Sequence, residues 1–82
     1  MKQIVIFKSE YCESCSIIDE TISMLPPECD ITIYDIDSDE FLAGSLAVEY
    51  TPTVIVFKDG VEQERLVGNL TPSHILSIYE SL

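Results

Sequence analysis

The sequence predicts a single α/β domain, residues 1–82, with a mixed four-stranded sheet and helices on both faces. Apolar residues recur at strand spacing and at helix spacing in alternating segments, which gives the order β-α-β-α-β-β-α. Two proline-containing pairs, Pro26-Pro27 and Thr71-Pro72, mark a helix end and a helix start. Asp59-Gly60 lies between the last two strand-like runs and is typical of a hairpin. A chain of 82 residues is long enough for one domain only.

The first half of the chain predicts a strand, a helix and a second strand. Residues 3–8 form a continuous apolar run with β-branched residues, as in a strand buried on both faces. A helix is expected from Cys15 to Leu25, where the prolines stop it. Its apolar residues recur at helical spacing: Ile18, Ile22 and Leu25. Residues 30–36 alternate as a second strand, which must run parallel to the first because a helix connects them.

The second half predicts a short helix, a hairpin and a last helix. Asp37, Ser38 and Asp39 are natural caps for a helix whose apolar residues are Phe41, Leu42, Leu46 and Ala47. Residues 53–57 and 61–67 are strand-like and, joined by the Asp-Gly turn, must be antiparallel. Thr71 and Pro72 suit the cap and first turn of the last helix. One face of that helix carries Ile75, Ile78, Tyr79 and Leu82.

The charge of the chain limits its partners. It has 15 acidic residues against 4 lysines and arginines, a net charge of −11. Such a surface repels phosphate backbones and anionic lipids, so neither nucleic acid nor a membrane is an expected partner. It favours basic or neutral protein partners, although it also serves solubility alone. The first residues lack the length and small-residue exit of a signal peptide, so a cytoplasmic protein is expected.

Two of the three cysteines form the candidate catalytic site. Cys12 and Cys15 lie at the junction of the first strand and the first helix. Free backbone N–H groups and the helix dipole at a helix start stabilise a thiolate, which is the attacking species. Cys15, one turn further, can close a small disulfide ring with Cys12. We assign Cys12 as the nucleophile and Cys15 as the resolving thiol. Lys8 would favour the Cys12 thiolate, whereas Glu10 and Glu13 would oppose it.

Metal binding is the main alternative for these cysteines. A structural zinc site needs four ligands, and only Cys29 and His74 remain as soft or borderline donors, neither in a paired motif. No metal is therefore expected, His74 is interpreted as a surface or packing residue, and Cys29 as a structural or incidental thiol. Asp35, Asp37 and Asp39 resemble the start of a calcium loop. Glu40 and Leu46 occupy the positions where that loop needs its glycine and its last acid, so this site is rejected.

Four segments of the chain resemble the thioredoxin family, in the family's order. They are the redox motif Glu10 to Cys15, the strand end Tyr34 to Asp37, the proline loop with its strand and hairpin from Tyr50 to Gly60, and the glycine turn Leu66 to Leu70. The family's extra N-terminal strand and helix have no counterpart. The chain therefore looks like a short thioredoxin-like protein, close in size to glutaredoxins.

The resemblance implies a fold, a site and a reaction. It implies the thioredoxin fold, a cis Pro52 packed beside the cysteine pair, and substrate binding by Tyr11, Thr51, Pro52 and Gly68. The reaction is reduction of protein disulfides through a reversible Cys12–Cys15 disulfide, with electrons from an upstream reductase or a low-molecular-weight thiol and with no cofactor.

Two departures from the family pattern bear on the mechanism. The family usually has a tryptophan before the first cysteine, where this chain has Tyr11. It also buries an aspartate on the first of these strands and a lysine on the next, and the matching positions here are Ile6 and Ile33. Without that carboxylate, either resolution is slower or water accepts the proton of Cys15.

The sequence is also compatible with two other functions. One is a glutathione-dependent, glutaredoxin-like reductase, which the short length and Thr51-Pro52 favour. Residues 68–71 lack the Gly-Gly and the acidic pair expected for gripping glutathione. The other is a redox-inert or metal-binding adaptor on the same fold.

Overall fold

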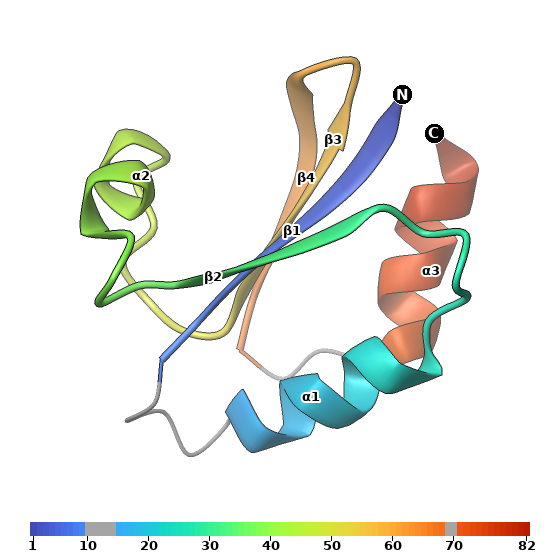
Figure 1. Cartoon of the computed structure of the whole chain (residues 1–82). Helices are drawn as coiled ribbons and strands as arrows, with labels where there is room; N and C mark the ends of the chain where they lie inside the picture. The colour runs from blue at the N-terminus through green and yellow to red at the C-terminus, as the bar shows by residue number, and fades with distance from the viewer. Residues whose placement is uncertain (10–14, 69–70) are drawn as a thin grey trace.

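The computed structural model describes residues 1–9, 15–68 and 71–82, with the backbone alone for residues 15–17. Every predicted element is present in the predicted order (Figure 1). The elements are β1 (Lys2–Lys8), α1 (Cys15–Met24), β2 (Ile31–Asp35), α2 (Glu40–Ser45), β3 (Thr53–Lys58), β4 (Val61–Val67) and α3 (Pro72–Ser81). In the described part of the chain, no helix is long and apolar enough to cross a bilayer.

The four strands form one mixed sheet in the order β2-β1-β3-β4. β1 and β2 are parallel, as their helical connection requires, while β3 is antiparallel to both β1 and β4. Helices α1 and α3 lie on one side of the sheet and α2 lies on the other (Figure 1). The structure therefore confirms the predicted sheet with helices on both faces.

Two apolar clusters hold these layers together, one on each face of the sheet. The cluster under α1 and α3 contains Ile4, Ile6, Ile18, Leu25, Val54 and Ile75. The cluster under α2 contains Phe7, Ala43, Val48 and Ile55. Alternate residues of β1 and β3 enter opposite clusters, because successive side chains of a strand point to opposite faces. The expectation that β1 is buried on both faces is only partly right, since Gln3 and Val5 stay half-exposed beyond the end of α2.

The turn between β3 and β4 has the conformation that Asp59-Gly60 predicts. Asp59 and Gly60 have φ values of 53° and 82°, the left-handed pair that a two-residue hairpin needs. The Asp59 amide donates to the Met1 carbonyl at 2.8 Å, and the Asp59 carboxylate accepts a hydrogen bond from the N-terminal ammonium. That bond to the ammonium holds the pKa of Asp59 below its usual value. The start of the chain is thereby fastened to the hairpin.

The two capping predictions have different outcomes. Thr71 caps α3 as predicted, because its Oγ1 accepts from the His74 amide at 3.3 Å and Pro72 occupies the first turn. Asp39 precedes α2, but its side chain makes no cap hydrogen bond. Its carboxylate instead accepts from the Asp35 amide at 3.3 Å, so this acid closes the turn before the helix.

The predicted apolar face of α2 needs one correction. Phe41 is 90% exposed, whereas Ala43 is buried and Leu42 and Leu46 pack beside it. A helix of six residues makes fewer than two turns, so only one narrow stripe of it can meet the sheet. Phe41 lies outside that stripe, and its place in the predicted apolar face is wrong.

Burial in the α2-side cluster predicts a large stability difference between two apolar truncations. Ile55 is fully buried, and Ile55→Ala is expected to lower the free energy of unfolding by about 2–5 kcal/mol through lost burial and a residual cavity. Met24 is 72% exposed on α1, and Met24→Ala is expected to change it by no more than about 0.5 kcal/mol. Urea unfolding measures both, and equal losses would contradict this core assignment.

Candidate active site

The sheet register gathers several predicted site residues at one edge. Thr53, the first residue of β3, pairs with Phe7 near the end of β1 and with Val67 at the end of β4. The residues just past this row are therefore Pro52 before β3 and Gly68 after β4, and the chain leaves β1 toward the cysteines from the same row. In Figure 1 this edge is the lower one, where α1 also begins.

The proline loop has the geometry that the resemblance implies. The Thr51–Pro52 peptide bond is cis, and Pro52 is buried. Its carbonyl accepts a hydrogen bond from the Gly68 amide at 3.1 Å, which joins two of the predicted substrate-binding residues. On the other side of the loop, the buried Thr53 hydroxyl donates to the Tyr50 carbonyl. The sequence did not predict this hydrogen bond, because a threonine that begins a strand gives no signal beyond strand propensity.

The described residues on either side of the cysteine segment are bound to the rest of the fold. Tyr11 and Cys12 lie outside the described residues, and Cys15 is described only as the first backbone position of α1. Before the segment, the Lys8 carbonyl accepts from the Ile36 amide at 2.9 Å, and the Ser9 hydroxyl donates to Asp37 at 3.0 Å. After it, α1 is packed into the core through Ile18.

Lys8 forms an ion pair with a carboxylate of α1. Its Nζ lies 2.9 Å from Oδ1 of Asp19, one turn into α1. The pair links the end of β1 to the helix and offsets part of the positive charge that would favour the Cys12 thiolate.

The two positions that depart from the family pattern are neighbours in the sheet. Ile6 and Ile33 are register partners across β1 and β2. Ile6 is fully buried in the same cluster as Ile18, whereas Ile33 is 43% exposed on the edge strand. The buried polar side chains in the described part of the chain are those of Thr21 and Thr53, so no described carboxylate is buried there.

Cys29 lies at the other end of α1 from Cys15. Cys15 begins α1, which is about 15 Å long, and Cys29 follows its far end. The next residue, Asp30, accepts from the Ile4 amide at 2.8 Å, at the edge of the sheet where β1 starts. A disulfide needs Cα atoms within about 7 Å, so Cys29 cannot bridge Cys15 in this fold. Partial burial, with help from Glu28 and Glu80, raises the pKa of the Cys29 thiol.

Among the described residues, no three histidine, cysteine, aspartate or glutamate side chains lie together in a way that could hold a metal ion. His74, which the sequence leaves as a possible zinc donor, is exposed in the first turn of α3. The aspartates around β2 and α2 serve the turn instead, where Asp35 Oδ1 accepts from the Asp37 and Ser38 amides at 2.8 and 3.3 Å.

Solved structures define the class of fold. A mutant thioredoxin from Halobacterium salinarum superposes with a TM-score of 0.91 at 23% identity, over 98% of this chain and 73% of that one. Thioredoxin 1 from Thermosipho africanus gives a TM-score of 0.85 at 23% identity, over 96% of this chain and 91% of that one. The chain has the thioredoxin fold.

Sequence relatives then give the family. The Thioredoxin family profile matches residues 1–81. A thioredoxin from Chlamydia trachomatis is 37% identical over 68 residues, covering 79% of this chain and 67% of that protein. A thioredoxin from Staphylococcus aureus is 33% identical over 70 residues, covering 80% and 67%. This chain belongs to the thioredoxin family, and in general terms it is a thiol–disulfide oxidoreductase.

The glycine turn at the site predicts opposite effects for two glycine substitutions. Gly68 has a φ of 92°, and a Cβ there would meet no atom within 4 Å, so only backbone strain opposes a side chain. Gly68→Ala is expected to lower the free energy of unfolding by about 1–3 kcal/mol. The matched control Gly44→Ala, in α2, also meets nothing within 4 Å and is expected to stabilise by about 0.5–1 kcal/mol. Denaturant unfolding distinguishes them, and a neutral Gly68→Ala would contradict the strained turn.

The environment of Cys29 predicts slow alkylation. In a Cys12→Ser/Cys15→Ser double variant, Cys29 is the only thiol. Because burial raises its pKa, less thiolate is present at a given pH, and the pH midpoint of its reaction with iodoacetamide is expected above that of a free cysteine. Glu28→Gln is expected to lower the midpoint slightly. A midpoint at or below that of free cysteine would contradict this placement.

Proposed function

We propose that this protein reduces disulfide bonds in other proteins through Cys12 and Cys15. Membership of the thioredoxin family supports a reaction of this class. The observation that carries the assignment to these residues is that α1 begins at Cys15, directly after Cys12-Glu13-Ser14 in the sequence. A helix start offers unpaired backbone N–H groups and a positive dipole end, which stabilise a thiolate and make it available at neutral pH.

The proposed reaction has two exchange steps. The Cys12 thiolate attacks one sulfur of the substrate disulfide, and the other substrate sulfur leaves as a thiolate that takes up a proton. Cys15 then loses its proton and attacks the Cys12 sulfur of the mixed disulfide, which releases the second substrate thiol. Two electrons have passed to the substrate, and the protein holds a Cys12–Cys15 disulfide. An external thiol or a reductase must return the two electrons, and the proposed setting is the reducing cytoplasm.

The apolar environment of Ile6 supports a particular route for the Cys15 proton. The position that carries a buried aspartate in the family is a fully buried isoleucine here. With no carboxylate at that position, we propose that the Cys15 proton passes directly to water during resolution. The second step then depends on hydroxide and buffer concentration more than it would with an internal base.

The proline loop supports the proposed substrate contacts. Pro52 lies at the edge of the sheet where β1 leads toward Cys12, and it is hydrogen-bonded to Gly68. An extended segment of a substrate protein can lie along such an edge and pair with backbone groups of the loop. We propose Tyr11, Thr51, Pro52 and Gly68 as the surface that receives it.

Three serine variants test the proposal by insulin reduction with dithiothreitol as electron donor. Cys12→Ser is expected to reduce activity to the rate of dithiothreitol alone, because the nucleophile is gone. Cys15→Ser is expected to lose turnover and, when the reduced variant is mixed with insulin after dithiothreitol has been removed, to accumulate a mixed disulfide on Cys12 that is visible by mass spectrometry. Cys29→Ser is the matched control and is expected to keep full activity. Unchanged activity in Cys12→Ser would refute the assignment.

A further inference from the structure

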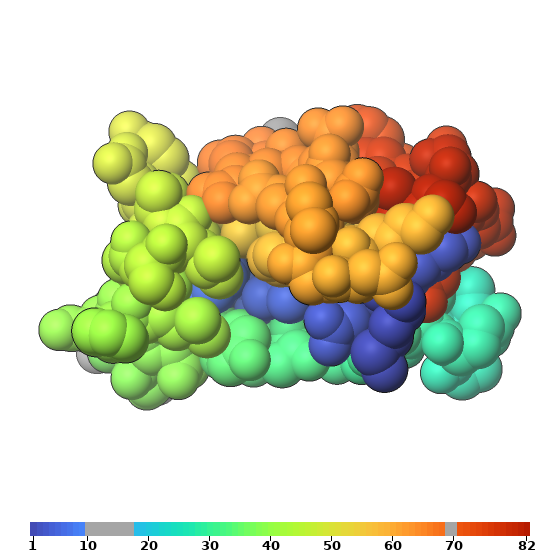
Figure 2. Space-filling view, turned by 90° about the horizontal axis from the view of Figure 1, so that it is seen from above, coloured from blue at the N-terminus to red at the C-terminus, as the bar shows by residue number. Residues whose placement is uncertain are grey.

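The α2 side of the sheet carries an open apolar hollow, separate from the cysteine segment. Its volume is about 260 Å³. Its apolar lining comes from β1, β2, α2 and β3: Val5, Tyr34, Leu42, Leu46 and Phe57. Figure 2 shows β1, in blue, at the surface between β2 and the β3–β4 hairpin, with α2 at the left. We refer to this region as the α2-side hollow.

The α2-side hollow exists because α2 is too short for the sheet that it covers. Six helical residues span about 9 Å, whereas the seven residues of β1 span about 23 Å. Phe7 and Ile55 are fully buried under α2, but Val5 and Phe57, two residues further along the same face, are only half-buried. The far part of this face therefore has no helix over it.

The opposite face of the sheet shows what full coverage looks like. There, α1 and α3 contribute ten residues each. Ile4, Ile6, Val54 and Val56 beneath them are all fully buried. The incomplete layer on the α2 side is thus a local feature of that face and not a general consequence of the small size of the domain.

All three lysines lie on the opposite face. Strand alternation puts Lys2, Lys8 and Lys58 on the side of α1 and α3. Two contacts agree with this placement, since the Lys2 ammonium lies 5.3 Å from the ring centre of Tyr79 in α3 and Lys8 pairs with Asp19 in α1. No lysine therefore lies on the α2 side of the sheet to balance the negative charge of acids there.

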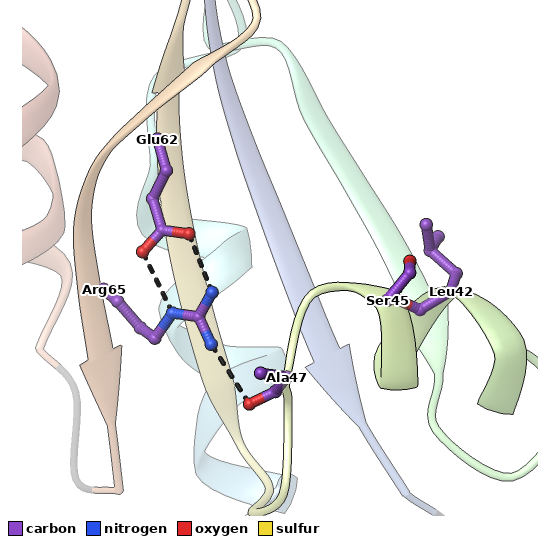
Figure 3. Close-up of polar contacts among 5 residues, drawn as sticks. All are labelled: Leu42, Ser45, Ala47, Glu62 and Arg65. Atoms are coloured by element: carbon purple, nitrogen blue, oxygen red, sulfur yellow. Dashed lines mark hydrogen bonds and ion pairs between the residues drawn. The ribbon is translucent and has the colours of Figure 1, made fainter.

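The remaining strong cation, Arg65, is already neutralised. Its guanidinium donates two hydrogen bonds to Glu62, at 3.0 and 2.7 Å, and a third to the Ala47 carbonyl at 3.3 Å (Figure 3). These bonds to Glu62 raise the pKa of Arg65 and lower that of Glu62.

The helix beside the hollow and the segment that follows it carry two acids and no lysine or arginine. Glu40 in the first turn of α2 and Glu49, which follows that helix, are both exposed. Of the four lysines and arginines, Lys8 pairs with Asp19 and Arg65 pairs with Glu62. Together with the net charge of −11, these acids favour a basic partner over an acidic one.

We propose that the α2-side hollow docks an amphipathic helix of a partner protein, one with apolar residues on one face and lysines or arginines beside them. A helix fits because it completes the incomplete helical layer, and apolar anchors of such a helix fill a hydrophobic groove. The basic flanks match the acidic charge of α2 and of the whole chain. The volume is below the roughly 300–1,000 Å³ of small-molecule sites, which favours a few protein side chains over a small ligand. A second copy of this chain is disfavoured because each copy carries a net charge of −11.

A synthetic helical peptide tests the proposal without knowledge of the partner. It carries leucines and one tryptophan on its apolar face and lysines on its flanks, and a matched control has glutamates in place of the lysines. The protein has no tryptophan, so the peptide fluorescence reports binding alone. We expect saturable binding of the basic peptide with a blue shift, amide shift changes at Val5, Leu42 and Phe57 in NMR spectra, and binding of the acidic peptide weaker by at least about tenfold.

Surface variants locate the peptide. Leu42→Gln and the milder Val5→Thr are each expected to weaken the basic peptide several-fold, while the control Met24→Gln, exposed on α1, leaves binding unchanged. Circular dichroism checks that each variant is folded, and insulin reduction is expected to stay at the level of the unmodified protein. The proposal is wrong if the basic peptide does not bind, if both peptides bind equally, or if the shift changes map to α1 and α3. Dimerisation that Leu42→Gln abolishes would also overturn it, since the occupant would be a second copy.

Discussion

The register of β3 between β1 and β4 determines which residues meet at the edge of the sheet beside the cysteine segment. Thr53 pairs on one side with Phe7 and on the other with Val67, so three chain segments meet at one edge of the sheet. A shift by one residue would exchange the two faces of β3, so that Val54 would leave the cluster under α1 and α3 and Ile55 would leave the cluster under α2. The apolar clusters on the two faces prevent that shift. They thereby fix Pro52 beside Gly68, at the edge where the chain leaves β1 toward the cysteines.

The two faces of the sheet have different roles in this account. The face under α1 and α3 is fully packed, and it anchors the helix that begins at Cys15. The α2 face is packed only near the site edge, under Phe7 and Ile55, and becomes open toward the hairpin. The proposed thiol chemistry therefore lies at the edge of the sheet beside Pro52, while the proposed docking of a basic helix lies on the open half of the α2 face. Substitutions in one region can be tested without disturbing the other.

Local sequence signals predicted the helices, strands and turns well. They predicted less well which side chains become buried when these elements pack together. Asp59-Gly60 and Thr71-Pro72 act within a few residues, so the hairpin and the start of α3 followed directly from them. The exposure of Phe41 could not be predicted from its helical spacing, because it depends on where the six residues of α2 meet the sheet.

The same limit applies to the site. The cis Pro52 was expected from the family resemblance alone, since local sequence gives any X–Pro bond only about 5–6% cis. The pairing of Lys8 with Asp19 and the hollow beside α2 arise from tertiary packing, and no sequence pattern marks them. An NMR comparison of oxidised and reduced protein tests whether Cys12 and Cys15 are the redox pair. Oxidation is expected to change the amide shifts of Ser9, Thr53 and Gly68 and to leave the hairpin unchanged, whereas changes centred on Cys29 or the hairpin would contradict this assignment.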